Sequence, residues 1–171
     1  MHHGRILGLA MLLGFTTQTA SAQQSGCDFN AGFTAFDFWV GSWDVTDNTT
    51  GNVAGSNRIE KIEAGCVVME HWTSVGGGTG TSLNYYNPVT DVWRQLWVSA
   101  GRYSIDIVGG LQNGAMVLTG ELHNFVGNSS IPFRGTWTPQ DDGSVRQFFE
   151  QFNAETNVWD PWFDGRYVRT E

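Results

Sequence analysis

The chain has 171 residues, of which nine are basic and 17 acidic, giving a formal net charge of −8. Nucleic acids and anionic membrane surfaces are bound by clustered Lys and Arg, so this balance argues against both as partners. The length suits one domain with a hydrophobic core of its own.

Residues 1–22 have the pattern of a secretory signal peptide. Arg5 precedes an apolar run over residues 6–15, and the small residues Ala-Ser-Ala follow at positions 20–22. The apolar run is too short to cross a bilayer, so we expect no lasting membrane anchor. Cleavage leaves a single domain, residues 23–171, which keeps 17 acidic residues but loses Arg5. We expect this domain to be exported, either to the periplasm or out of the cell.

Cys27 and Cys66 are the two cysteines of the chain. In an exported protein such a pair predicts one disulfide bond, which would tie the N-terminal segment to the strand that starts near Cys66. Closing a loop of this length contributes roughly 3–4 kcal/mol on the chain-entropy model. A redox-active pair is the alternative, but the two cysteines do not form a Cys-X-X-Cys motif.

Strand patterns recur along the rest of the chain at short, regular intervals, separated by Gly, Asn, Asp and Pro, and no long segment has a helical period. The predicted strands are 38–47, 54–63, 66–75, 79–87, 92–100, 102–109, 114–123, 131–138, 144–153 and 157–168. Ten strands joined by tight turns favour an antiparallel meander, whose edges are best hidden by closure. We therefore predict an all-β, up-and-down barrel, with a short helical or irregular lid over residues 28–36.

The first predicted strand carries the densest aromatic segment of the chain, Phe-Asp-Phe-Trp-Val-Gly-Ser-Trp-Asp-Val at 36–45. Alternation places Trp39, Gly41, Trp43 and Val45 on one face. A glycine beside a bulky indole indicates that another element crosses closely at Gly41.

Several segments together resemble a group of exported bacterial proteins of uncharacterised function with a lipocalin-like (calycin) fold. The matching segments are FDFWVGSWDV, GSNRIEKIEAGCVVMEHW, GTSLNYYNPVTDVWRQLWV, GGLQNGAMVLTGE and FDGRYVR. The resemblance covers nearly all of residues 23–171 and implies a calycin-type barrel and export, but it supplies no reaction. His71 departs from the pattern, where a smaller polar residue such as Asn is expected.

In lipocalins an arginine of the last strands packs over the tryptophan of the first strand and closes the base of the barrel. By this resemblance we expect Trp43 to be covered by an arginine near the C-terminus. Arg166 is the first choice and Arg169 the second.

A calycin barrel binds ligands in its interior, so the inward side chains are the candidate site. Trp93, Gln95 and Trp97 share one face of a strand, and two exposed indoles would form an apolar patch that monomers rarely carry. We therefore expect all three to point inward, with Gln95 at the floor of a slot between the indoles. The alternative is that the two indoles merely fill the barrel.

The strand at 144–153 has a similar pattern, and we expect Gln147, Phe149 and Gln151 to point inward, with Tyr103 as a further contributor. Such an interior would have aromatic walls, amide groups and no charge, which suits a small apolar or aromatic ligand with one or two polar groups. The alternative is that these glutamines are solvated on the surface.

The sequence shows no strong catalytic motif. The charged candidates are Glu60, Glu63, Glu70, His71, His123 and Glu150, of which His71 and Glu150 are weak candidates for an acid or base. Only two histidines lie beyond residue 22, so no metal site is expected. Ten-stranded nitrobindins hold haem through a histidine near the end of the chain. Residues 159–171 contain none, so we expect no haem.

The sequence therefore predicts an exported barrel that binds a small hydrophobic or aromatic molecule. The alternative is a small barrel enzyme, such as an isomerase, cyclase or hydrolase, acting on an apolar substrate. A shifted pKa of a titratable group inside the cavity would favour the enzyme, because a carrier needs only shape and a polar contact.

Overall fold

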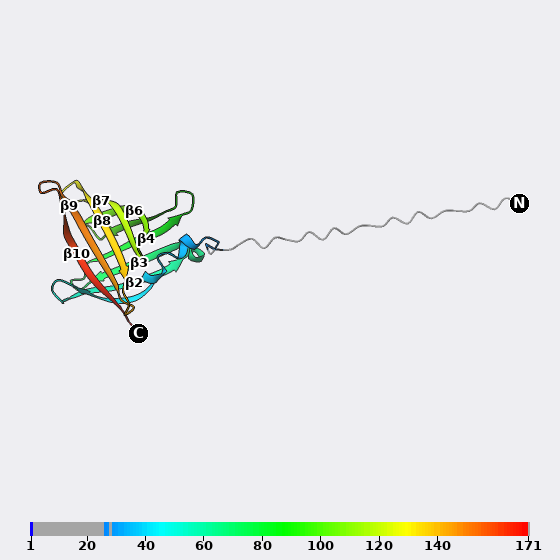
Figure 1. Cartoon of the computed structure of the whole chain (residues 1–171), viewed down its shortest axis with the longest axis horizontal. Helices are drawn as coiled ribbons and strands as arrows, with labels where there is room; N and C mark the ends of the chain where they lie inside the picture. Colours follow the sequence, from blue (N-terminus) through cyan, green and yellow to red (C-terminus); the bar gives the residue numbers. More distant parts are fainter. Residues whose placement is uncertain (2–25, 28, 171) are drawn as a thin grey trace.

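The computed structural model describes residues 1, 26–27 and 29–170 of the chain (Figure 1). The predicted signal peptide at residues 1–22, apart from Met1, lies outside the described residues. Among the described residues, no helix is both long enough and apolar enough to span a bilayer.

The described residues form ten strands joined in a closed antiparallel barrel (Figure 1). They are β1 (Gly41–Asp47), β2 (Val53–Ile62), β3 (Val67–Ser74), β4 (Thr79–Asn87), β5 (Val92–Ser99), β6 (Tyr103–Gln112), β7 (Ala115–Asn124), β8 (Ser129–Pro139), β9 (Val145–Asn153) and β10 (Val158–Arg169). Each strand pairs with its neighbour in sequence, and β10 returns to pair with β1. The predicted all-β, up-and-down barrel is confirmed, and it is compatible with a lipocalin-like fold.

Alternating burial along the strands separates the interior of the barrel from its outside. On β7, for example, Met116, Leu118 and Leu122 are buried while Thr119 and Glu121 face solvent. Successive side chains of a strand point to opposite faces, so the residues at every second position form the core.

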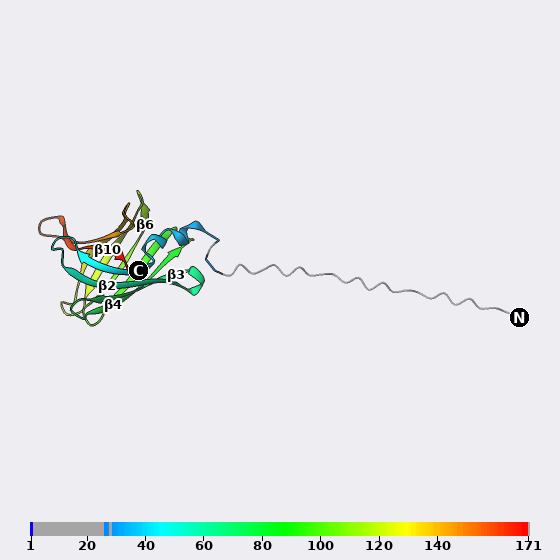
Figure 2. The ribbon, with the colours of Figure 1, turned by 90° about the horizontal axis from the view of Figure 1, so that it is seen from below.

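A lid covers one end of the barrel, formed by the short 3₁₀ turns η1 (Ala31–Thr34) and η2 (Asp37–Trp39) (Figures 1 and 2, blue). Phe36 and Trp39 are fully buried and stacked on each other, with ring centroids 4.9 Å apart. Both rings also pack against Trp137 of β8. The first strand was expected to begin at residue 38 but begins at Gly41, because the preceding residues turn inward to bury these two rings.

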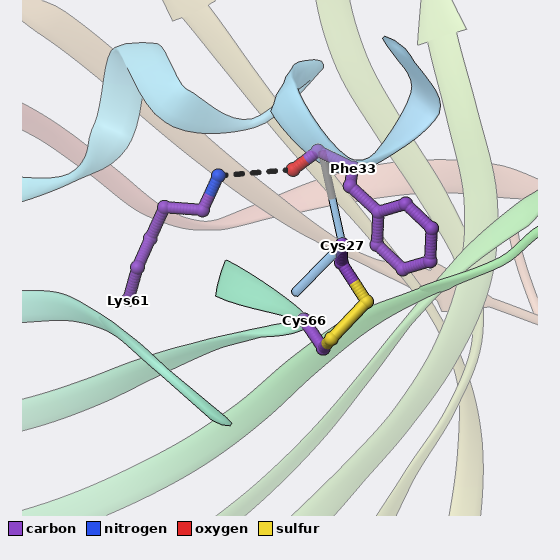
Figure 3. Close-up of a disulfide and its surroundings, with 4 residues drawn as sticks. All are labelled: Cys27, Phe33, Lys61 and Cys66. Carbon is purple, nitrogen blue, oxygen red and sulfur yellow. Dashed lines mark hydrogen bonds between the residues drawn. A yellow bond between two sulfur atoms is a disulfide. The ribbon is translucent and has the colours of Figure 1, made fainter. Parts of the chain in front are cut away.

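The disulfide between Cys27 and Cys66 is confirmed, with the two sulfur atoms 1.98 Å apart (Figure 3). It joins the segment that precedes the lid to Cys66, which lies between the short 3₁₀ turn η3 (Glu63–Gly65) and β3. Lys61 of β2 adds a second connection, because its Nζ donates to the carbonyl oxygen of Phe33 and to Asp37 Oδ1, at 3.2 and 2.7 Å. The disulfide and the two contacts of Lys61 therefore help to fix the lid to the barrel.

Arg169, and not Arg166, covers Trp43. Its guanidinium carbon lies 4.3 Å from the centre of the indole ring, and its Nη1 donates to the carbonyl oxygen of Val40 at 2.9 Å. Trp43 and Arg169 are direct partners in the β1–β10 register. Gly41 is where this side chain crosses, since a Cβ there would lie 2.2 Å from Arg169 Nη1 and the residue has a positive φ of 148°.

The expectation for Arg166 was wrong because of strand alternation. Tyr167 is buried in the interior, so Arg166 beside it points outward, where it pairs with Asp142 at 2.6 Å. Arg169, two positions after Tyr167, returns to the inner face at the end of the strand.

Candidate ligand-binding site

A cavity of about 110 Å³ lies inside the barrel. Alternate hairpins of an antiparallel meander lie at the same end. The lid packs at the end of the barrel that holds the β2–β3 and β4–β5 hairpins. The cavity residues Trp72, Tyr103 and Trp162 lie at the other end, close to the β3–β4, β5–β6 and β9–β10 hairpins. The cavity therefore opens at the end opposite the lid, where Trp162 is 40% exposed.

Most of the cavity wall is aromatic. The rings that line it are Trp72, Trp97, Tyr103, Phe149, Trp162, Phe163 and Tyr167. Trp162 packs edge-on to Tyr103, with centroids 5.5 Å apart, and roughly parallel to Phe149 at 6.2 Å. Apolar walls of this kind supply non-directional affinity for the carbon skeleton of a ligand.

Trp162 and Phe163 are consecutive residues that both face the cavity, which regular alternation does not allow. The β9–β10 register shifts between Pro161 and Phe163, so Trp162 is the extra residue of a β-bulge. A bulge reverses the face that later residues present, and Pro161 has no N–H to lose from the ladder. The bulge thus adds one aromatic ring to the mouth of the cavity.

The floor of the cavity is polar and centres on Glu70 of β3, which is 3% exposed. Asn57 Nδ2 donates to Glu70 Oε1 at 2.7 Å, and Ser82 Oγ donates to Oε2 at 2.6 Å. Asn84 Nδ2 donates to Ser82 Oγ at 2.8 Å, and Gln95 Nε2 donates to Asn84 Oδ1 at 2.8 Å. One hydrogen-bonded chain therefore links β2, β3, β4 and β5 beneath the aromatic walls.

Burial raises the pKa of Glu70 from its ordinary value of 4.5 to about 7, although hydrogen bonds from Ser82 and Asn57 act in the opposite direction. Burial also raises the pKa of the hydroxyl group of Tyr103, and raises that of Tyr167 well above 10. The negative charge of ionised Glu70 contributes to both of these shifts. At neutral pH the cavity therefore contains one carboxyl group that is about half ionised, Glu70, and two tyrosines whose hydroxyl groups are neutral.

Two buried polar atoms of the lining residues have no hydrogen-bond partner among the described residues: Gln147 Oε1 and Trp97 Nε1. Gln147 is 5% exposed and Trp97 is 8% exposed. Buried polar atoms in proteins are nearly always paired, with protein, water or ligand. The cavity thus presents the free acceptor Gln147 Oε1 and the N–H of Trp97, which lies near the Tyr103 hydroxyl group without forming a regular hydrogen bond to it.

The structure places five of the predicted interior residues on this cavity: Gln95, Trp97, Tyr103, Gln147 and Phe149. Two others do not line it. Gln151 is only partly buried, beyond Phe149 towards the β9–β10 hairpin.

Trp93 is buried at the lid end of the barrel. Its ring packs edge-on against Phe36, and its Nε1 donates to the carbonyl oxygen of Gly32 at 3.1 Å. The expected slot between Trp93 and Trp97 is therefore not the cavity, because the lid residues occupy the space on the Trp93 side.

The weak acid–base candidates His71 and Glu150 do not line the cavity. His71 is adjacent to the inward-facing Glu70, so it points outward, and its Nε2 lies 3.3 Å from Glu60 Oε1. Glu150 forms a bidentate pair with Arg134, with both N–O distances 2.8 Å. Glu150 therefore serves an ion pair on the outer face of the barrel, and His71 contacts Glu60 on the same face.

Glu70 is one of the charged candidates named from the sequence, but the predicted interior site does not include it. Alternation along β3 puts it on the same face as Val68 and Trp72, which is a recognisable pattern of an interior face. The bulge that brings in Trp162 has a weaker sequence pattern, a proline within an otherwise regular strand.

Within the described part of the chain, no group of three or more His, Cys, Asp or Glu side chains could hold a metal ion. Neither a scan against models of known protein families nor a search of curated proteins finds a match to the chain. The fold and the cavity together define a closed ten-stranded barrel with an aromatic, partly polar interior site.

Proposed function

We propose that this protein is an exported binding protein that holds one small molecule, with an apolar body and one or two polar groups, in the cavity of the barrel. The observation that supports it most directly is the pair of unpartnered polar atoms, Gln147 Oε1 and Trp97 Nε1, among aromatic walls. A ligand that pairs with both would relieve a desolvation penalty of about 1–3 kcal/mol for each atom.

The volume of about 110 Å³ limits the ligand to a small body. Apolar cavities on the order of 150 Å³ accept benzene, so a single ring or a compact branched group is the appropriate size. Trp162 at the mouth offers a side chain that can move to admit a somewhat larger molecule.

The disulfide between Cys27 and Cys66 supports the export part of the proposal, because such bonds persist in oxidising compartments. The predicted signal peptide at residues 1–22 points the same way. The family proposed for the chain is the exported lipocalin-like group that its sequence segments resemble.

Tryptophan fluorescence during titration with phenol, indole and 3,3-dimethyl-1-butanol tests the proposal, using two matched variants of β5. Trp97→Phe removes the free N–H from the cavity, whereas Trp93→Phe changes an equally buried indole outside it. We expect at least one probe to bind the wild type and Trp93→Phe with similar Kd, and to bind Trp97→Phe several-fold more weakly. Absence of a saturable response to every probe, or equal losses in both variants, would contradict the proposal.

A second candidate, a small enzyme, is favoured by one observation: Glu70 is a titratable group inside the cavity, with a pKa of about 7. A carboxylate in this position could act as a general base towards a bound apolar substrate. Proton–deuterium exchange at the α-carbon of cyclohexanone in D₂O, followed by NMR, tests this. The enzyme predicts exchange that Glu70→Gln abolishes; exchange at the background rate with wild type argues for a carrier.

A further inference from the structure

The hydrogen bonds around Glu70 all run towards its carboxyl group. Asn57 and Ser82 each donate to one oxygen, and Ser82 is itself oriented by a donor, Asn84 Nδ2. Both protons of the Asn84 amide are used, because its Nδ2 also donates to the carbonyl oxygen of Val68 at 3.0 Å. This arrangement stabilises the ionised carboxylate.

No positively charged side chain of the described residues balances this carboxylate. The residues that face the cavity from the strands packed around β3 include no Lys, Arg or His among the described residues. The polar side chains that contact Glu70 or line the cavity with it are Asn57 of β2, Ser82 of β4, Gln95 of β5, Tyr103 of β6, Gln147 of β9 and Tyr167 of β10. Of these only the two tyrosines titrate, and neither becomes positive. A buried carboxylate without a counter-charge is unfavourable by several kcal/mol unless a partner neutralises it.

The rest of the cavity suits a positive group. Seven aromatic rings line it, and the face of an aromatic ring attracts cations, most strongly where water is excluded. A buried carboxylate inside an aromatic box is the arrangement that recognises ammonium groups.

We propose that the molecule bound in this cavity is a small organic cation, whose ammonium group pairs with Glu70 and lies among the aromatic rings of Trp72, Trp97 and Trp162. This inference rests on the proposed binding function and names the charge of its ligand. A hydroxyl group on the same molecule could donate to Gln147 Oε1 and accept from Trp97 Nε1, the two polar atoms without partners.

Two observations favour an organic cation over a metal ion. One carboxylate is too few hard ligands for a metal, and no cluster of metal-binding side chains occurs in the described residues. Aromatic rings contribute to an alkylammonium site but are poor ligands for hard metal ions. The net charge of −8 favours the approach of any cation.

Binding of such a cation depends on pH in a defined direction. Since the pKa of Glu70 is about 7 in the free protein, the cation must displace a proton at lower pH. Tyr103 and Tyr167 stay neutral over this range, because their pKa values are raised from 10. Affinity for a permanent cation therefore rises about tenfold per pH unit up to pH 6 and levels off near pH 8.

Isothermal titration calorimetry with choline and 3,3-dimethyl-1-butanol tests the charge directly. The two probes have nearly the same shape, but choline carries a quaternary nitrogen where the alcohol has carbon. At pH 8 we expect choline to bind at least tenfold more tightly than the alcohol. Because choline does not titrate, its pH profile between 5 and 8 reports the protein alone, and the release of one proton per choline bound at pH 6 is expected.

Glu70→Gln is the matched variant, since the amide keeps the size of the side chain and can pair with both Asn57 and Ser82. We expect it to lose both the tenfold preference for choline over the neutral alcohol and the pH dependence of choline binding. The wild-type probe pair and pH profile decide the question even if the variant does not fold.

The outcomes separate this inference from the proposed function. If the neutral alcohol binds as tightly as choline, or choline affinity is flat from pH 5 to 8, the cation proposal is overturned while a ligand-binding cavity stands. If choline fails to bind but phenol or indole binds, the cation proposal is again overturned. If none of the four probes binds, both proposals fail.

Discussion

Replacing Glu70 by Gln should change how the stability of the protein depends on pH. The pKa of this carboxyl group is about 7 in the folded protein and near 4.5 when the chain is unfolded, because burial disfavours the ionised form. Between these two values the folded state holds a proton that the unfolded state has lost, so the free energy of unfolding falls as pH rises. The stabilising contribution is complete below about pH 4.5 and is lost as pH passes through 7.

The magnitude follows from the size of the shift. Each pKa unit corresponds to about 1.4 kcal/mol, so raising the pKa from 4.5 to about 7 makes the group's contribution about 3 kcal/mol less favourable at pH 8 than at pH 4.5. Glu70→Gln removes this dependence and leaves every other titratable group in place. The difference in unfolding free energy, variant minus wild type, should therefore increase by about 3 kcal/mol between pH 4.5 and 8.

Urea denaturation of both proteins at intervals between these pH values, without ligand, measures the difference. Contributions from the other carboxyl groups cancel when the two curves are subtracted. A difference that stays constant across this range, within the error of the extrapolation, would refute the account of Glu70 as a buried carboxyl group without a counter-charge.

Further predictions concern the end of the barrel that carries the lid. Replacing Cys27 and Cys66 together by Ser opens a loop of 39 residues and should lower the free energy of unfolding by about 4 kcal/mol, measured by urea denaturation under oxidising conditions; an unchanged midpoint would contradict this. Arg169→Met should cost about 1–2 kcal/mol through the lost stacking on Trp43 and the lost hydrogen bond, and Arg166→Met, whose ion pair is exposed, should cost clearly less. Equal effects of the two arginine variants would show that the contact with Trp43 contributes little.

The fold could be predicted from the sequence because its main determinants are local. Turn residues and period-two alternation mark each strand, and the number of strands leaves closure as the natural way to hide the edges. The same alternation correctly predicts that Gln95 and Gln147 point inward, although both side chains are polar.

The site was harder to predict because it depends on register. Which arginine covers Trp43 is decided by the β1–β10 pairing, and the identity of the inward residues of β10 changes at the bulge near Trp162. Trp93 and Trp97 share one face of β5, yet only Trp97 reaches the cavity, because the lid fills the interior beside Trp93. Such long-range packing leaves no pattern within a single strand.

The central claim, that a small molecule binds in the interior cavity, is tested most directly by the indole N–H resonances in a ¹H–¹⁵N NMR spectrum. Trp97 Nε1 faces the cavity without a partner, whereas Trp39 is a buried residue of the lid at the opposite end and serves as an internal control. Titration with choline, phenol, indole and 3,3-dimethyl-1-butanol should shift the Trp97 resonance saturably for at least one probe and leave that of Trp39 in place. If the Trp97 resonance moves with none of the probes, or no more than that of Trp39, the claim is contradicted.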